Sequence, residues 1–261
     1  MEFRIEIIDR TDAVLFSRSG GGEVFAVYDG EYADGDKIRI SCSEKNVFAA
    51  VKLDDCMDTA LLYLTGPFVL PVPFNEHKMS YNPKSFSGSR HYLYMRQAAA
   101  TEIKTPRNLA FNPYDCHENM TLFPHTSANV ETRGESVFAS RNAVDGLVAN
   151  TFHGEWPYSS WGINRNPDAE FRLEFGRSVV LQSVTLYLRA DFPHDSWWKS
   201  ADVTFSDGGT MTVPLQKTGS AQKFSFEPRT VTELVLHHLI KAEDESPFPA
   251  LTQIETFGTE A

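Results

Sequence analysis

Apolar and charged positions alternate along most of the chain. Phe3, Ile5 and Ile7 alternate with mostly charged neighbours, and a period of two recurs over residues 47–53 and 171–175. Because successive side chains of a strand point to opposite faces, this alternation predicts strands with one buried face. No stretch of about 12 residues has the periodicity of an amphipathic helix. The pattern therefore predicts an all-β protein.

Short apolar runs and turn signals complete the pattern. Residues 60–64 and 68–70 are nearly continuous apolar runs, which fit strands buried in a sandwich. Asp-Gly pairs, which favour tight turns, stand at positions 29–30, 34–35 and 207–208, and residues 20–22 predict a further turn. These signals predict about eight short strands before residue 120 and about eight after it, as in sandwiches of jelly-roll type. We predict two antiparallel β-sandwich domains.

A change of composition separates the two sets of strands. Residues 101–125 are rich in proline and asparagine, and their apolar residues follow no period. Leu109, Phe111 and Tyr114 within this segment need burial, so we expect an ordered linker packed along the domain boundary. We predict an N-terminal domain over residues 1–120, with the linker beginning near residue 101, and a C-terminal domain over residues 121–261.

Composition and charge exclude several classes of partner. The formal net charge is -11 and the basic residues are scattered, so we expect no nucleic-acid partner. No apolar run approaches about 18 residues, so we expect no membrane span. The first ten residues, MEFRIEIIDR, lack the apolar core of a signal peptide. We therefore expect a cytoplasmic protein, or one from which an export signal has been removed.

The cysteines agree with a reducing compartment. Cys42, Cys56 and Cys116 are an odd set without metal-binding spacing, which favours free thiols. A Cys42–Cys56 disulfide stays open as the alternative.

One stretch organises the C-terminal half of the chain. Residues 142–161 read NAVDGLVANTFHGEWPYSSW, in which an Asp-Gly turn precedes an irregular loop of aromatic and polar residues. The segments EFRLEFG, VTLYLR, ADVTFSDG and LTQIETFG follow at residues 170–176, 184–189, 201–208 and 251–258. In their order and spacing, residues 125–258 resemble discoidin-type domains, also called coagulation-factor C-type domains. The resemblance implies a galactose-binding-like β-sandwich whose loops at one end bind glycans.

Two loops hold the residue types that a sugar site needs. A pyranose presents apolar C–H faces to aromatic rings, and its hydroxyls bond to planar charged groups. Loops 150–166 and 190–199 supply these types, and a third loop, 241–250, is also rich in polar and aromatic residues. The candidate ligand-binding residues are His153, Glu155, Trp156, Tyr158, Arg165, Arg189, Asp191, His194 and Trp197.

Packing competes with binding for several aromatic and charged residues. Trp161 stands where the resembled family keeps a core tryptophan, so we expect it to be structural. Neighbours on a strand face opposite ways, so we expect one of Trp197 and Trp198 in the core. Arg189 and Asp191 fit a salt bridge that holds the loop as well as they fit a ligand site.

The resemblance also implies a structural calcium ion beside the NAVDG turn. Its ligands here would be Asp145, Thr151 and Gln253, together with backbone oxygens. Calcium prefers several anionic oxygens, and Gln253 stands where the family has a glutamate. A turn held by Asp145 without a metal therefore stays open as the alternative.

We predict a non-catalytic carbohydrate-binding protein whose partner is a glycan. A protein-interaction or assembly module, with a protein partner or as a homo-oligomer, is an alternative, because fold alone does not settle function. A sugar-active enzyme is another, with Glu155 and either Asp191 or Asp195 as the carboxyl pair. A metal site of His153, Glu155 and His194 is a third. The sequence has neither a G-x-S-x-G motif nor a phosphate-binding loop.

Overall fold

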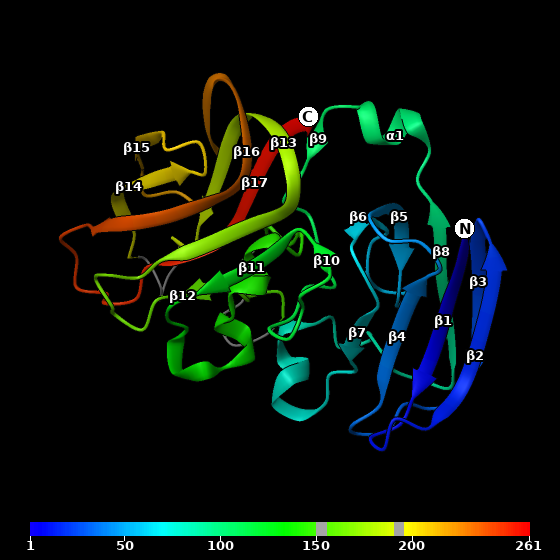
Figure 1. Cartoon of the computed structure of the whole chain (residues 1–261). Helices are drawn as coiled ribbons and strands as arrows, with labels where there is room; N and C mark the ends of the chain where they lie inside the picture. The colour runs from blue at the N-terminus through cyan, green and yellow to red at the C-terminus, as the bar shows by residue number, and fades with distance from the viewer. Residues whose placement is uncertain (150–155, 191–195) are drawn as a thin grey trace.

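The protein consists of two β-sandwiches that lie side by side (Figure 1). The structure is a computed structural model that describes residues 1–149, 156–190 and 196–261. All strand pairs within these residues are antiparallel. Each sandwich encloses its own hydrophobic core. The predicted fold class, all-β with antiparallel sandwiches, is confirmed.

The first sandwich has two sheets that share one core. Their strand orders are β2-β1-β4-β7 and β10-β6-β5-β8-β3. Ile5 and Ile7 from one sheet and Leu62 and Leu93 from the other are 0% exposed, so the alternation of the sequence marks the inward faces. The strands are β1 (Glu2–Ile8), β2 (Val14–Gly21), β3 (Glu23–Asp29), β4 (Lys37–Cys42), β5 (Val47–Lys52), β6 (Ala60–Leu64), β7 (Phe68–Pro71), β8 (Arg90–Gln97) and β10 (Leu122–Phe123).

Strand β2 is one that the alternation did not indicate. We expected a turn at residues 20–22, whereas β2 continues to Gly21 and pairs with β1, with Gly20 opposite Phe3. It lies at the edge of its sheet and most of its side chains are exposed. A strand without a buried face carries no alternation of polarity, so periodicity could not reveal it.

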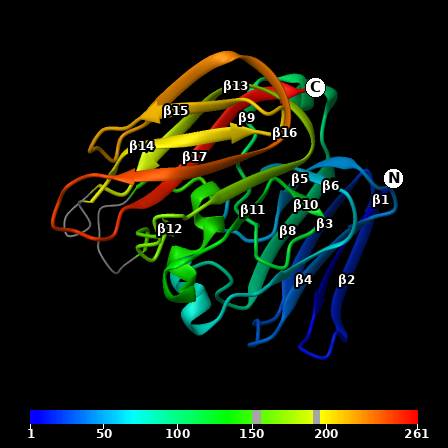
Figure 2. The same ribbon diagram turned by 60° about the vertical axis from the view of Figure 1, so that its left-hand side comes forward.

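The second sandwich is built on long antiparallel strands, which Figure 2 shows from a second direction. β13 (Phe171–Leu188) pairs with β16 (Gln222–Lys241) on one side and with β17 (Ala250–Glu260) on the other. The predicted hairpin around residues 207–209 is present as β14 and β15. The remaining strands are β9 (Arg107–Asn108), β11 (His125–Ala128), β12 (Trp161–Gly162), β14 (Trp198–Phe205) and β15 (Thr210–Pro214).

Strand β13 joins two runs that the sequence shows as separate. Its pairing with β16 shifts register between Glu174 and Val179, where the strand bends. Gly176 at this bend has a φ of 68°, and a Cβ atom there would lie 2.4 Å from the ring of Phe123. Only glycine fits both the left-handed backbone and the close approach. The bend lets the first part of β13 pair with β11 and the second part with β17.

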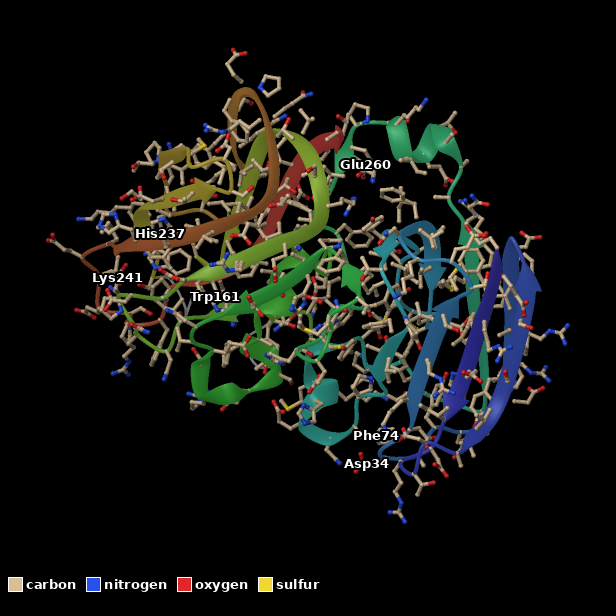
Figure 3. All side chains as sticks on the ribbon, in the orientation of Figure 1. Asp34, Phe74, Trp161, His237, Lys241 and Glu260 are labelled. Atoms are coloured by element: carbon tan, nitrogen blue, oxygen red, sulfur yellow. The ribbon has the colours of Figure 1, made fainter. Side chains whose placement is uncertain are left out.

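Two tryptophans form the centre of the second core, as expected. Trp161 is 0% exposed and Trp198 is 1% exposed, with ring centroids 6.4 Å apart. The indole N–H of Trp161 donates to the Val130 carbonyl at 3.0 Å, so its one polar group is satisfied. Figure 3 shows Trp161 within the second sandwich. Trp197 is half-buried and packs against the core from its margin.

The segment of residues 101–125 pairs with strands of both sandwiches. β9 pairs with β17 of the second sandwich, whereas β10, later in the chain, pairs with β6 of the first. Leu109 accordingly belongs to the second core, and Tyr114 and Leu122 belong to the first. Figures 1 and 2 both show β10 and β11 between the two sandwiches. The division into domains at residue 120 stays a prediction.

Polar and aromatic contacts also join the sandwiches. Arg177, in β13, donates to Glu260 through Nε at 2.7 Å and Nη2 at 2.8 Å. The same guanidinium lies 5.0 Å from the ring centroid of Phe48 and 5.1 Å from that of Tyr63, both in the first sandwich. Arg107 forms a second ion pair with Glu260, which Figure 3 labels beside the junction. Arg177 therefore holds the C-terminal strand and stacks on the neighbouring sandwich at once.

The helical segments are short, as the absence of helical periodicity predicted. None of the helices within the described ranges is long and apolar enough to cross a membrane. The segments are α1 (Ala100–Lys104) and the 3-10 turns η1 (Asn75–Ser80), η2 (Thr132–Gly134), η3 (Ser136–Phe138) and η4 (Ser140–Val144).

Candidate functional site

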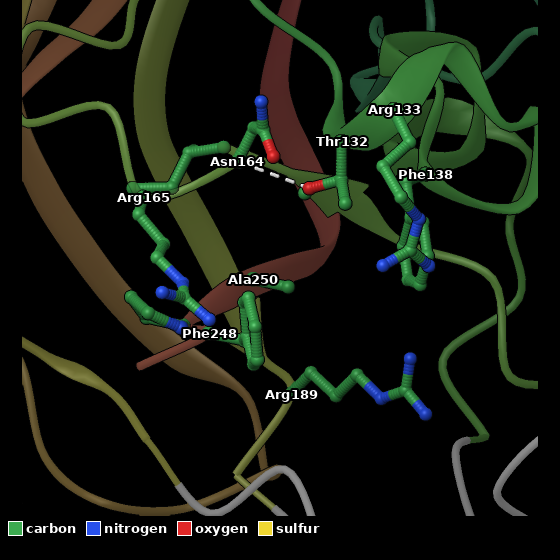
Figure 4. A pocket seen from close by; sticks show the side chains of 11 residues that line it. Thr132, Arg133, Phe138, Asn164, Arg165, Arg189, Phe248 and Ala250 are labelled. Carbon is green, nitrogen blue, oxygen red and sulfur yellow. Dashed lines mark hydrogen bonds between the residues drawn. The ribbon is translucent and has the colours of Figure 1, made fainter. Parts of the chain in front are cut away.

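A small pocket of about 70 Å³ opens where β13 ends and β17 begins. The 3-10 turns η2 and η3 and the turn after β12 close its other sides. We call it the arginine pocket (Figure 4). It is lined by Thr132, Arg133, Phe138, Gly162, Ile163, Asn164, Arg165, Arg189, Phe248, Pro249 and Ala250.

Each of the three arginines of the pocket lies over an aromatic ring. The distances from guanidinium carbon to ring centroid are 4.5 Å for Arg165 and Phe248, 5.3 Å for Arg189 and Tyr158, and 5.8 Å for Arg133 and Phe138. Figure 4 shows the arginines on different sides of the pocket. A stacked guanidinium keeps its N–H groups pointing outward in its own plane, so it can still donate to a ligand.

The turn after β12 positions Arg165. Asn164 and Arg165 have φ values of 48° and 61°, in the left-handed region that non-glycine residues rarely adopt. The Asn164 N–H donates to Thr132 Oγ1 at 2.9 Å, and the Asn166 N–H donates to the Ile163 carbonyl at 2.8 Å. Two hydrogen bonds thus support a costly backbone conformation, a combination that is common at binding sites.

Arg189 forms the buried side of the pocket. Its side chain is almost fully buried, and its backbone N–H donates to the Ala250 carbonyl at 3.0 Å, which ties the end of β13 to the start of β17. Burial raises the pKa of the Tyr158 phenol, an effect that the charge of Arg189 opposes. Tyr158 therefore stays a neutral phenol near pH 7, and its ring packs against the Arg189 guanidinium.

The lining is basic in an acidic protein. Its described residues include no aspartate or glutamate, although the chain has a formal net charge of -11. Arg133 is bound by Glu135 through two contacts of 2.5 and 2.8 Å, so its charge is largely compensated. Arg165 is exposed at the mouth. Arg165 therefore carries the guanidinium at the mouth of the pocket, and Arg189 carries the one at its buried side.

The structure brings together two of the predicted ligand-binding residues, Arg165 and Arg189, with Tyr158 against Arg189. Trp156 lines a different hollow, and Trp197 packs against the core without lining the pocket. The remaining candidates, His153, Glu155, Asp191 and His194, lie outside the described residues, so their roles stay predictions.

Several lining residues were not among the predicted ones. Thr132, Arg133 and Phe138 come from the 3-10 turns ahead of the NAVDG turn, where the sequence shows no periodic pattern. Phe248 belongs to loop 241–250, whose polar and aromatic content was the available signal. The cation–π pairing of Arg165 with Phe248 joins residues far apart in sequence, so composition alone could not identify it.

Gln253 crosses the NAVDG turn and uses both ends of its amide there. Its Oε1 accepts the Gly146 N–H at 3.1 Å, and its Nε2 donates to the Ala143 carbonyl at 2.6 Å. Asp145 Oδ1 accepts the Leu147 N–H at 2.8 Å. A calcium ion needs free oxygen ligands, whereas here an amide N–H already occupies a backbone carbonyl. The Ala143 carbonyl is therefore already engaged by Gln253, whereas Asp145 Oδ2 has no hydrogen-bond partner among the described residues.

Other parts of the expected metal sites lie outside the described ranges. Thr151, the third expected calcium ligand, and the set His153, Glu155 and His194 are among these residues. Among the residues that the structure describes, no group of three His, Cys, Asp or Glu side chains could hold a metal ion.

We expect the thermal stability of the protein to be independent of calcium. A ligand that binds only the folded state raises stability, so excess chelator and added calcium should both leave the melting temperature unchanged. Gln253→Ala should instead lower the free energy of unfolding by about 1–3 kcal/mol, because it leaves buried turn groups without partners. Gln97→Ala, at an exposed glutamine, is the matched control. A melting temperature that falls by several degrees in chelator would show instead that the turn binds calcium.

A family model described as a domain of unknown function (DUF7402) matches residues 123–245. The match covers most of the second sandwich and none of the strands β1 to β8. No curated protein matches the chain. Because the family description names no activity, the function has to be argued from the site.

Solved structures similar to the chain include three modules that bind saccharides. A chitosan-binding module of a chitosanase/glucanase from Paenibacillus sp. IK-5 is 18% identical, covers 58% of this chain and 99% of its own, and has a TM-score of 0.43. A fucose binding module of Streptococcus pneumoniae is 13% identical, with 59% and 99% covered and a TM-score of 0.43. The family 32 CBM from C. perfringens NanJ, in complex with galactose, is 13% identical, with 51% and 91% covered and a TM-score of 0.39. They are of the class that residues 125–258 resemble, but no residue or activity is carried over from them.

Proposed function

We propose that the protein binds a saccharide, without acting on it, at the arginine pocket of the second sandwich. The observation that carries the proposal is that Arg165, paired with Phe248, and Arg189, whose guanidinium lies over Tyr158, line one small pocket. The Arg165 guanidinium supplies charged donors, and the Phe248 ring supplies a flat apolar face. These are the two kinds of group that a sugar ring needs.

The size and position of the pocket favour the edge of a sugar. The pocket is small, at about 70 Å³, which suits a substituent or one edge of a pyranose. Arg189 lies at the buried side and Phe248 and Arg165 lie nearer the mouth, so a sugar that inserts one edge would pass Phe248 and Arg165 before it reaches Arg189. Hydroxyls that leave water need such donors, because an unpaired buried hydroxyl costs free energy.

The chemistry of the lining favours binding over catalysis. Glycoside hydrolysis uses two carboxyl groups that flank the scissile bond, and the described residues of the lining include neither aspartate, glutamate nor histidine. Thr132 is the hydroxyl residue of the lining, and its Oγ1 already accepts the Asn164 N–H. The enzyme alternative therefore depends on Glu155 with Asp191 or Asp195, all outside the described residues, and would require turnover that Glu155→Gln abolishes.

We expect Arg165→Ala to weaken saccharide binding by about 10- to 100-fold, the loss that follows when a charged donor is removed from a ligand. Phe248→Ala should weaken it by roughly 3- to 10-fold through the loss of the apolar face. A panel of methyl glycosides of fucose and the common hexoses would first identify a binding sugar, and titration calorimetry would then give each Kd.

Arg18→Ala is the matched control for Arg165→Ala. Arg18 is an exposed arginine of strand β2 in the first sandwich, so its removal should leave the Kd as it is in the wild type. Circular dichroism would verify that each variant is folded. Unchanged affinity in both Arg165→Ala and Phe248→Ala would place the site elsewhere, and an absence of binding across the panel would overturn the proposed function.

A further inference from the structure

A second hollow lies at the junction of the two sandwiches. Its volume is about 630 Å³, within the range of roughly 300–1,000 Å³ that is common for ligand sites. Trp156 and Tyr158 of the second sandwich line it on one side. Lys78, Met79 and Tyr81, in and just after η1 of the first sandwich, line it on the other. We call this hollow the junction groove.

Hydrogen bonds fix the two walls of the junction groove relative to each other. Glu76 in η1 accepts the Ser136 N–H at its Oε1, and the Ser136 hydroxyl donates to the Glu76 carbonyl, both at 2.7 Å. Ser136 begins η3 of the second sandwich. Because both residues form these hydrogen bonds through backbone groups as well as side chains, η1 has a fixed position against the second sandwich. A ligand would not have to order this part of the groove.

The ring of Tyr81 is also held in place. The Arg141 guanidinium lies 4.3 Å from its centroid, and the Phe86 ring meets it edge-on at 5.7 Å. Arg141 is itself buried and donates to Ser80 Oγ at 3.2 Å and to the Asp115 carbonyl at 3.0 Å. Tyr81 therefore presents a rigid aromatic surface to the groove, one with little side-chain entropy to lose on binding.

The surface of the groove suits uncharged sugar faces. Met79 is 49% exposed and Trp156 is half-buried, so a soft thioether and an indole are available for contact. Lys78 is the charged residue of the lining, and its ammonium group donates to Ser87 Oγ at 2.6 Å. With aromatic and apolar groups on both walls and no carboxylate among the described lining residues, the groove favours C–H faces over ions.

Tyr158 connects the junction groove to the arginine pocket. Its ring faces the Arg189 guanidinium at 5.3 Å, and Arg189 lines the arginine pocket. The same residue lines the junction groove. Tyr158 therefore lies between the two sites, in contact with Arg189 of the arginine pocket and within the lining of the junction groove.

We propose that the junction groove is a second subsite for an oligosaccharide whose end unit occupies the arginine pocket. This inference rests on the proposed function. The following units pass Tyr158, stack on Trp156 and contact Met79 and Tyr81 of the first sandwich. The first sandwich thus completes the binding surface, and the ligand class is an uncharged oligosaccharide of several units.

Chain-length dependence tests the proposal on the full chain. Titration calorimetry would compare the methyl glycoside and the hexasaccharide of one sugar, with galacto-, chito- and cello-oligosaccharides as probes. The hexasaccharide should bind at least about 10-fold more tightly than the methyl glycoside, because each further stacked unit adds affinity. Equal affinities for the two lengths, with the methyl glycoside still bound, would overturn the second subsite and leave the proposed function intact.

Variants assign the extra affinity to the groove. The ratio of hexasaccharide to methyl glycoside affinity should fall by roughly 3- to 10-fold in Trp156→Ala and by about 3-fold in Met79→Ala. Met79 is well exposed, so its variant should fold even if the loss of Trp156 disturbs the neighbouring loop. Met120→Ala, at a methionine that is 76% exposed and outside the groove, should keep the wild-type ratio.

The decisive comparison is Met79→Ala against Met120→Ala. If the ratio of hexasaccharide to methyl glycoside affinity falls in Met79→Ala and keeps its wild-type value in Met120→Ala, the first sandwich contributes to binding of the oligosaccharide. The same ratio in both variants would overturn that contribution. If no saccharide of either length binds, the proposed function fails, and this inference fails with it.

Discussion

Replacing Asp115 by alanine should lower the free energy of unfolding by about 3–5 kcal/mol, the cost of breaking a buried charged network. Asp115 is fully buried in the segment that joins the sandwiches. Its Oδ1 accepts hydrogen bonds from His125 Nδ1 at 2.8 Å and Asn119 Nδ2 at 2.9 Å. Its Oδ2 accepts the N–H and the hydroxyl of Thr126, both at 2.8 Å. Urea unfolding, followed by circular dichroism, measures the loss.

The size of the effect follows from the position of the partners. Alanine would leave the His125 imidazole and the Thr126 N–H without their acceptor in a place that water does not reach, and an unpaired buried donor costs about 1–3 kcal/mol. The Asp115 carbonyl also accepts Arg141 Nε, and Arg141 contacts Tyr81 of the first sandwich. Alanine keeps this backbone carbonyl, so the substitution should act on the segment first and reach the junction only where the segment itself shifts.

Two variants separate this network from a general effect of losing a carboxylate. Asp168→Ala, at an exposed aspartate, should change stability by no more than about 0.5 kcal/mol. Asp115→Asn keeps the shape and one acceptor and should lie between wild type and Asp115→Ala. A loss below about 1 kcal/mol in Asp115→Ala would show that the junction does not depend on these hydrogen bonds.

Strands with a buried face were predictable from sequence, because burial leaves a period of two. The alternating run at Phe171, Leu173 and Phe175 is the first part of β13, and all three side chains are 0% exposed. Periodicity could not show that this run and residues 184–188 belong to one bent strand, since the bend depends on Gly176 meeting Phe123 across the junction. It also could not show β2, whose exposed edge position imposes no pattern.

The candidate site was predictable only in part, for a different reason. Arg165 and Arg189 stand in loops whose composition is unusual, so residue type was enough to single them out. Phe248 and Thr132 acquire a role only when η2, the turn after β12 and the start of β17 meet in space. The contribution of η1 to the junction groove is still harder to predict from sequence, because it depends on how the two sandwiches pack against each other through Glu76 and Ser136.

Asp145 is a buried carboxyl group that burial keeps partly protonated. Burial raises its pKa to about 7, an effect opposed by the charge of Arg141 and by the hydrogen bond from the Leu147 N–H. Its Oδ2 has no hydrogen-bond partner within the part of the chain that the structure describes. The side-chain amide of Gln253 holds the turn from the other side through two hydrogen bonds, so the turn does not depend on a charged Asp145 carboxylate. A charge forming at this position therefore works against folding.

Asp145→Asn should consequently remove a loss of stability that the wild type suffers as the pH rises. Between the ordinary pKa of 3.8 and about 7, the unfolded chain releases the Asp145 proton while the folded protein retains it, so the free energy of unfolding falls with pH. At about 1.4 kcal/mol for each pH unit of that interval, the difference between variant and wild type should grow by roughly 3–4 kcal/mol from pH 4 to pH 8. Asparagine keeps an oxygen for the Leu147 N–H, so the two proteins should be alike near pH 4. Urea unfolding at several pH values measures this difference, in which all other titrating groups cancel, and Asp168→Asn at an exposed aspartate should show none. A difference that stays constant with pH, or that favours the wild type at pH 8, would mean that Asp145 is ionised in the folded protein and held by a cationic partner.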